Sequence, residues 1–186
     1  MGSRNKRTLK AFAFDLGNTL SHDTQLLKNV TADMCDWLFD NSLIHSRQAF
    51  AAAFKRINHA TNKPFISHTF GELEFFEKTF HELAINTISA QAALKKYREI
   101  LMHKIQPDQN ILDTFRLLKE KNIRIALLSN ERVMRVDSYL EKTNLGPFFD
   151  AIVVSEGIGF EKPDLRFFQG ALHQLNIKGD EMVMFG

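Results

Sequence analysis

Four short, largely apolar runs stand out along the chain, at positions 11–14, 123–128, 151–154 and 182–185. Each run has the length of a β-strand, and none alternates strictly between apolar and polar residues. This pattern is typical of strands that are buried on both faces, as in the interior of a parallel sheet. The runs therefore predict four strands of a parallel sheet.

Between positions 105 and 186 these strands alternate with segments in which apolar residues recur every three or four positions, as on the buried face of an amphipathic helix. Alternating strands and helices are typical of a parallel sheet with right-handed crossovers. We therefore expect an α/β fold with a Rossmann-like parallel sheet. The helices are marked by Ile111, Phe115 and Leu118, by Val133, Val136 and Leu140, and by Leu165, Phe168, Leu172 and Leu175.

From about residue 24 to 104 only the helical periodicity is present, and it predicts four helices, with Pro64 and Gly71 in the link between the second and the third. We expect a Rossmann-like core at 8–22 and 105–186, interrupted by a four-helix cap at 23–104. Ligands bind beyond the carboxyl ends of the strands in such sheets, so a helical insertion after the first strand would cover the pocket. The helix faces are marked by Leu27, Val30, Met34 and Trp37; by Phe50, Phe54 and Ile57; by Leu73, Phe76, Phe80 and Leu83; and by Leu94, Tyr97 and Leu101.

Composition narrows the class of protein. The 186 residues are 44% hydrophobic and 25% charged, as in an ordinary globular domain, and the single cysteine, Cys35, excludes a disulfide scaffold. No segment has the 18 apolar residues that a membrane span needs, and no signal peptide is present, so we expect a cytoplasmic protein. The net charge of +2 comes from a basic N-terminal segment, and without a basic stripe beyond it we expect no nucleic-acid partner.

Polar residues follow the predicted strands at the edge where their carboxyl ends meet. Asp15 follows the first strand, Ser129 and Asn130 follow the second, Lys162 lies in a loop after the third, and Gly186 ends the fourth. A carboxylate, a hydroxyl and an ammonium at one edge suit phosphoryl transfer, because the carboxylate can attack phosphorus while the others bind phosphate oxygens.

The order of these residues resembles the motifs of the haloacid dehalogenase-like hydrolase superfamily, in the branch with a helical cap after the first motif. Residues 14–20 (Phe-Asp-Leu-Gly-Asn-Thr-Leu) resemble its first motif, and residues 127–130 (Leu-Leu-Ser-Asn) its second. Residues 162–164 (Lys-Pro-Asp) resemble the third motif, and residues 183–186 (Val-Met-Phe-Gly) the beginning of the fourth. The resemblance extends over essentially the whole chain.

The resemblance implies a magnesium-dependent phosphatase that hydrolyses a small phosphorylated metabolite through an aspartyl phosphate. Mg²⁺ would bridge Asp15 and the phosphate, with the Gly17 carbonyl as another ligand. The resemblance also implies that Asp15 is the nucleophile and that Thr19 supports its loop. Ser129 and the backbone N–H of Asn130 would bind phosphate oxygens, and Lys162 would pair with the phosphate and the nucleophile. Asn18, Asn130 and His22 would contact the substrate.

Two departures from the family pattern keep other functions open. Gly17 stands where family phosphatases carry the aspartate that transfers protons, so a water, His22 or Asp23 would have to supply the proton. The chain also stops at Gly186, before the acidic residues of the fourth motif, and we expect a core that is incomplete at its C-terminus. The alternatives are a non-catalytic or truncated family member and, less favoured, a 2-haloacid dehalogenase. The sequence leaves the substrate's identity and the oligomeric state open.

Overall fold

The structure is a computed structural model that describes residues 8–61 and 72–186. A four-stranded parallel sheet in the order β3-β2-β1-β4 forms its centre, and this confirms the predicted α/β class. The elements in chain order are β1 Ala11–Phe14, α1 Asp23–Asp40, α2 Arg47–Thr61, α3 Glu72–Glu82, α4 Ala90–Lys104, α5 Gln109–Glu120, β2 Arg124–Ser129, α6 Val133–Thr143, η1 Gly146–Phe148, β3 Ala151–Val154, α7 Ser155–Ile158, α8 Leu165–Leu175, η2 Gly179–Glu181 and β4 Met182–Phe185.

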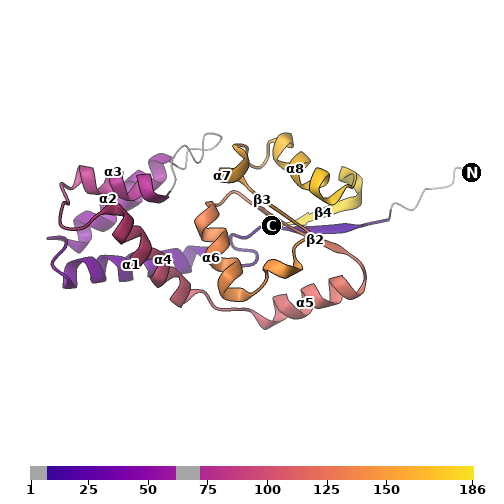
Figure 1. Cartoon of the computed structure of the whole chain (residues 1–186), viewed down its shortest axis with the longest axis horizontal. Helices are drawn as coiled ribbons and strands as arrows, with labels where there is room; N and C mark the ends of the chain where they lie inside the picture. Colours follow the sequence, from indigo (N-terminus) through magenta and orange to yellow (C-terminus); the bar gives the residue numbers. More distant parts are fainter. Residues whose placement is uncertain (1–7, 62–71) are drawn as a thin grey trace, which may run out of the picture.

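Both faces of the sheet are covered, which explains the apolar runs of its strands. The side chains of Phe12 and Phe14 pack with α5 and α6 on one face. Those of Ala11 and Ala13 lie on the other face with Phe167 of α8. Figure 1 shows α5 and α8 on opposite sides of the sheet.

The second strand begins one residue later than the sequence predicted, at Arg124 instead of Ile123, and it ends at Ser129. The backbone N–H of Ile123 donates to the carbonyl of Leu118 and so closes the last turn of α5. The ladder with β1 begins only at Arg124, which pairs with Ala11. Ser129 is the last residue of β2, at the strand end where the sequence analysis placed it.

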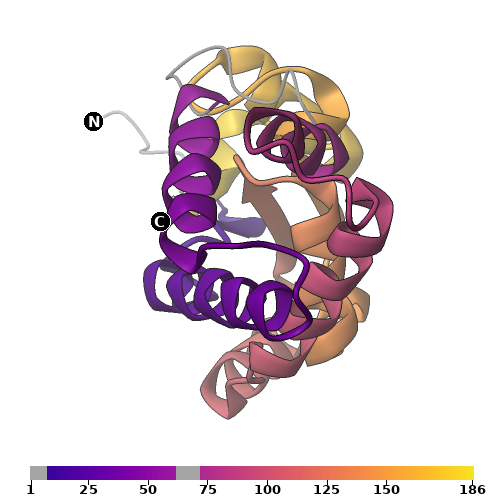
Figure 2. The same cartoon turned by 90° about the vertical axis from the view of Figure 1, so that its left-hand side faces the viewer.

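The helices α1–α4 form a bundle, which we call the helical segment, at the edge of the sheet where the strands end (Figures 1 and 2). Aromatic rings fill its interior: the ring centroid of Phe54 lies 4.3 Å from that of Phe75 and 5.4 Å from that of Phe76. Pro64 and Gly71, which were expected to punctuate this region, lie outside the described residues. The helix marked by Phe76 and Phe80 begins at Glu72.

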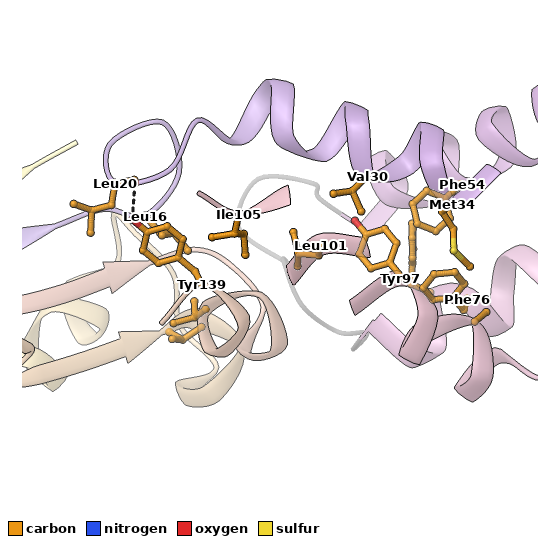
Figure 3. Packing of buried hydrophobic residues seen from close by; sticks show 14 of the residues in the cluster. Leu16, Leu20, Val30, Met34, Phe54, Phe76, Tyr97, Leu101, Ile105 and Tyr139 are labelled. Carbon is orange, nitrogen blue, oxygen red and sulfur yellow. Dashed lines mark hydrogen bonds between the residues drawn. The ribbon is translucent and has the colours of Figure 1, made fainter. Parts of the chain in front are cut away.

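A single hydrophobic cluster joins the helical segment to the sheet. It runs from Phe54 and Phe76 through Leu101 and Ile105 to Leu16 (Figure 3). No helix within residues 8–61 and 72–186 is both long and apolar enough to cross a bilayer. The division at residues 22/23 and 104/105 into core and cap stays a prediction.

Tyr139 of α6 connects this cluster to the loop that follows β1. Its hydroxyl donates a hydrogen bond of 2.6 Å to the carbonyl of Leu20, and both residues are buried (Figure 3). A buried carbonyl that loses its donor pays the cost of desolvation without compensation. We therefore expect this bond to stabilise the loop.

We predict that Tyr139→Phe lowers the free energy of unfolding by about 1–2 kcal/mol, because it removes the donor and leaves the Leu20 carbonyl buried. Urea unfolding followed by circular dichroism measures this, and the slope of the transition should stay unchanged. A variant as stable as the wild type would show that the bond contributes nothing.

Candidate active site

Asp15 is positioned by the two strands that flank β1. Phe14 pairs with Leu127 on one side and with Phe185 on the other, so Asp15 lies level with the next residues of those strands. The backbone N–H of Asp15 donates to the carbonyl of Phe185 at 2.9 Å. Its side chain is 25% exposed, so the carboxylate lies at the surface of the sheet edge and a ligand can reach it.

Gly186 fits against Asp15 because it has no side chain. A Cβ at this position would lie 2.6 Å from the Asp15 Cβ and 3.3 Å from Thr19 Oγ1. Its φ of +143° also falls in a region that side chains disfavour. The close approach therefore requires glycine here, and it brings Thr19 to the end of β4.

Lys162 neutralises the carboxylate. Its Nζ lies 2.7 Å from Asp15 Oδ1 and donates a second hydrogen bond of 2.8 Å to the carbonyl of Leu128. An ammonium has three N–H donors, so these two bonds leave one for a ligand oxygen. The Lys162 side chain is 16% exposed. The predicted pairing of Lys162 with Asp15 is thus present in the structure, although 147 residues separate the two in the chain.

The side chain of Asn130 holds the backbone of Lys162 in place. Its Oδ1 accepts a bond of 2.8 Å from the Lys162 N–H, and its Nδ2 donates one of 3.1 Å to the Lys162 carbonyl. The sequence pointed to Asn130 only as a ligand for the substrate. The amide clamp was missed, because nothing in either motif shows which loop the side chain will meet.

Ser129 is fully buried, and its Oγ has no hydrogen-bond partner within the part of the chain that the structure describes. A buried hydroxyl without a partner is costly, and such groups often mark a place where a ligand or water binds. An oxygen of a bound phosphate would satisfy it.

The loop after β1 folds around one carbonyl. That of Leu16 accepts the N–H groups of Leu20 and Ser21 at 3.0 Å each. Asn18 adopts a left-handed φ of 56°, and its Oδ1 lies 3.4 Å from the N–H of Thr24 in the first turn of α1. The geometry therefore shows Asn18 as a group that ties the loop to α1. His22, the N-cap residue of that helix, is exposed and makes no capping bond.

Few groups of the described residues could hold a metal ion. No cluster of three or more His, Cys, Asp or Glu side chains is found among them. Asp15 has a carboxylate oxygen that does not bond to Lys162, and the backbone carbonyl of Gly17 belongs to the same loop two residues later. Mg²⁺ is often held by one or two carboxylates together with substrate phosphate and water. One carboxylate and one carbonyl from the protein are compatible with such a site. Cys35 adds no reactive thiol, because burial raises its pKa to about 11.

Charged side chains also meet where the helical segment faces the end of β2. Glu72, the first residue of α3, lies near Arg132, Glu131 and Glu156. The pKa of Glu72 is raised to about 7, mainly by burial and in part by the two neighbouring acids, while Arg132 opposes the shift. Sequence reasoning assigned no role to this group, since residues 72 and 132 come together only through the tertiary fold.

The parallel sheet with an aspartate and a lysine paired at its carboxyl edge places the chain in the class of Rossmann-like proteins that bind ligands beyond their strand ends. A family model described as haloacid dehalogenase-like hydrolase matches residues 9–186. The chain belongs to that family, as the motifs predicted.

Two relatives show what the family includes. A glyceraldehyde 3-phosphate phosphatase of Methanothermobacter thermautotrophicus is 32% identical over 90 residues, which are 48% of this chain and 40% of that protein. Pyrophosphatase PpaX of Bacillus cereus is 23% identical over 155 residues, which are 79% of this chain and 70% of PpaX. The chain thus spans less than half the length of the first relative.

Solved structures share the fold at low identity. The HAD hydrolase YfnB of Bacillus subtilis, bound to magnesium, superposes with a TM-score of 0.67 at 22% identity, over 95% of this chain and 79% of YfnB. A 2-haloacid dehalogenase of Pseudomonas syringae gives a TM-score of 0.69 at 18% identity, over 95% and 77%. The fold alone therefore does not distinguish phosphoryl transfer from dehalogenation.

Glu72 makes stability depend on pH. Because its pKa is near 7 in the folded protein and about 4.5 when unfolded, the folded state holds a proton that the unfolded state has lost between these values. Stability should therefore fall as the pH rises from about 4.5 to 7. We predict that Glu72→Gln removes this fall and is more stable than wild type at pH 8, by at most about 3 kcal/mol.

Chemical denaturation at pH 5 and pH 8 measures the effect. Glu74→Gln is the matched control, because Glu74 lies in the same helix, is half-buried and pairs with Lys78. If Glu72→Gln and Glu74→Gln follow the same pH dependence, the carboxyl of Glu72 is not protonated in the folded protein.

Proposed function

We propose that this chain is the catalytic region of a magnesium-dependent phosphatase that acts on a small phosphomonoester through an aspartyl phosphate. The observation that carries the proposal is the pair formed by Asp15 and Lys162, 2.7 Å apart, beside the unpartnered hydroxyl of Ser129. A phosphate group needs both a nucleophile and donors for its oxygens, and these three side chains supply them. The phosphatase names of two relatives support the same class of reaction.

The chemistry follows from the groups present. The Asp15 oxygen that is not bonded to Lys162 attacks phosphorus, the bond from phosphorus to the ester oxygen breaks, and the leaving oxygen takes a proton from water. A water molecule then attacks phosphorus of the aspartyl phosphate, which releases phosphate and restores the carboxylate. Lys162 reduces the repulsion between the carboxylate and the incoming phosphate throughout.

Asp15 and the Gly17 carbonyl would hold Mg²⁺ together with the phosphate. The ion supplies a positive charge that draws electron density from phosphorus and orients its oxygens. Ser129 Oγ and the backbone N–H of Asn130 would bind the remaining phosphate oxygens, and Thr19 would support the loop from its place beside Gly186. Asn18, in the loop after β1, and His22, the N-cap residue of α1, would contact the substrate from beside this loop.

Gly17 decides which substrates test this function best. With no carboxyl at position 17 to protonate the leaving group, an aryl phosphate is the better probe, since its leaving group needs little protonation. Hydrolysis of 4-nitrophenyl phosphate in the presence of magnesium is therefore the first assay. Release of chloride from 2-chloropropionate, measured in parallel, would instead support a dehalogenase.

We predict that Asp15→Asn lowers hydrolysis of 4-nitrophenyl phosphate at least roughly 100-fold, because the amide oxygen is a poor nucleophile. The fold should persist, with the same circular dichroism spectrum. Asp113→Asn is the matched control, because Asp113 is exposed on α5 and pairs with Arg116. Retention of more than a hundredth of the activity would remove Asp15 from the mechanism.

We further predict that removal of divalent cations with EDTA lowers turnover by about 100-fold or more, and that added magnesium restores it. Calcium should restore much less, because its longer bonds and looser geometry suit the transition state poorly. Full activity in EDTA would exclude a magnesium-dependent reaction. The role of Asp15 would still be tested by Asp15→Asn.

A further inference from the structure

Arg132 lies between the candidate active site and the helical segment. It is the residue before α6 and comes three positions after Ser129, at the carboxyl end of β2. Its guanidinium lies 5.4 Å from the ring centroid of Phe75 on α3. The side chain thus spans the boundary between the edge of the sheet and the helices that face it.

The guanidinium has hydrogen-bonding capacity to spare. Its Nε is buried and has no hydrogen-bond partner within residues 8–61 and 72–186. Arginine stays charged at any ordinary pH, so the unmet donor belongs to a cation. A buried donor of this kind is costly unless a ligand satisfies it.

The acids nearby are largely committed elsewhere. Glu131 Oε2 lies 3.5 Å from the Nε of Arg135, and Glu156 Oε2 accepts the backbone N–H of Val133 at 2.6 Å. Glu72 remains, and burial raises its pKa to about 7. None of these contacts gives the buried Nε of Arg132 an acceptor among the described residues. Among the described residues, the buried Tyr97 also lies near Glu72, Arg132 and Arg135.

We propose that Arg132 is a specificity-determining residue that binds a second anionic group, a carboxylate or a phosphate, on the phosphomonoester substrate. The inference rests on the proposed function, since it assumes that the first phosphate is held by Ser129 and Lys162. A guanidinium binds either anion through paired N–H donors, which gives direction as well as charge. The substrate would lie with one anion at Asp15 and the other under the helical segment.

The test uses three series of alkyl phosphates of increasing chain length, which end in a hydroxyl, a carboxylate or a second phosphate. At one chain length we expect kcat/KM for an anionic end to exceed that for the hydroxyl end by at least about tenfold. The series with the higher kcat/KM shows whether the site prefers a carboxylate or a phosphate. Equal values at every length would overturn the proposal.

Substitutions of Arg132 test whether this residue causes the preference for an anionic end. Arg132→Gln should remove most of the tenfold preference and leave kcat/KM of the hydroxyl series within about twofold, while Arg132→Lys should keep part of it. Arg116→Gln is the charge-matched control, because Arg116 is exposed on α5. If Arg132→Gln lowers all three series equally, Arg132 only holds the helical segment through Phe75, and the proposal is wrong.

A binding measurement keeps this test separate from that of the proposed function. Calorimetry with the corresponding alkyl phosphonates needs no turnover. If no phosphate ester is hydrolysed but the acid-ended phosphonate binds at least about tenfold more tightly than the hydroxyl-ended one, and Arg132→Gln abolishes the difference, the phosphatase proposal fails and the anion site stands. If neither phosphonate is preferred, the anion site fails whatever the activity.

Discussion

The ion pair between Asp15 and Lys162 is the interaction on which the candidate site depends. A carboxylate that is to attack a phosphate must approach another anion, and without a nearby cation the two would repel each other. Lys162 places its ammonium 2.7 Å from one carboxylate oxygen and leaves the other oxygen for chemistry. The pair lies at the sheet edge with partial exposure, so the charges are close enough to matter while the site stays open to a ligand. The amide of Asn130 holds the lysine backbone in the position that makes this possible.

The parallel register of the sheet brings these groups together. Phe14 pairs with both Leu127 and Phe185, so β1 and β4 end at one level and β2 continues beside them to Ser129. At the fourth motif the convergence is tight enough that only glycine fits against Asp15. The hydrophobic cluster then continues from this edge into the helical segment through Leu16, Ile105 and Leu101, which seats the helices over the strand ends (Figure 3). The same packing that stabilises the fold therefore shapes the space above the site.

Much of this could be predicted from the sequence, for identifiable reasons. Strands buried on both faces give apolar runs, and one-sided helices give a period near 3.6, so the α/β order was legible. Asp15, Ser129 and Lys162 were found because each follows a strand. What could not be predicted depends on contacts between distant segments. The clamp of Asn130 on Lys162, the bond from Asn18 to Thr24, and the meeting of Glu72 with Arg132 all require the folded backbone. The one-residue shift of β2 arose because the end of α5 uses the N–H of Ile123.

With Gly17 in place of a carboxyl residue, the proposed reaction depends more on the charged groups around the site to lower its barrier. Position 17 of this chain offers no carboxyl that could protonate the leaving oxygen, and in the proposed reaction that proton comes from water. The barrier must then be lowered mainly by charge and by position, since these are the contributions that remain. Lys162 supplies charge at the reacting phosphate. A second cation that fixes the far end of the substrate would supply position, because binding energy from a remote group can hold the reacting atoms in line. Arg132, with an unmet donor between the strand ends and the helical segment, is placed to do this. The absence of a carboxyl at position 17 and the unpartnered Nε of Arg132 would then be connected. A site that cannot protonate the leaving group gains the most rate from a substrate that is bound at both ends.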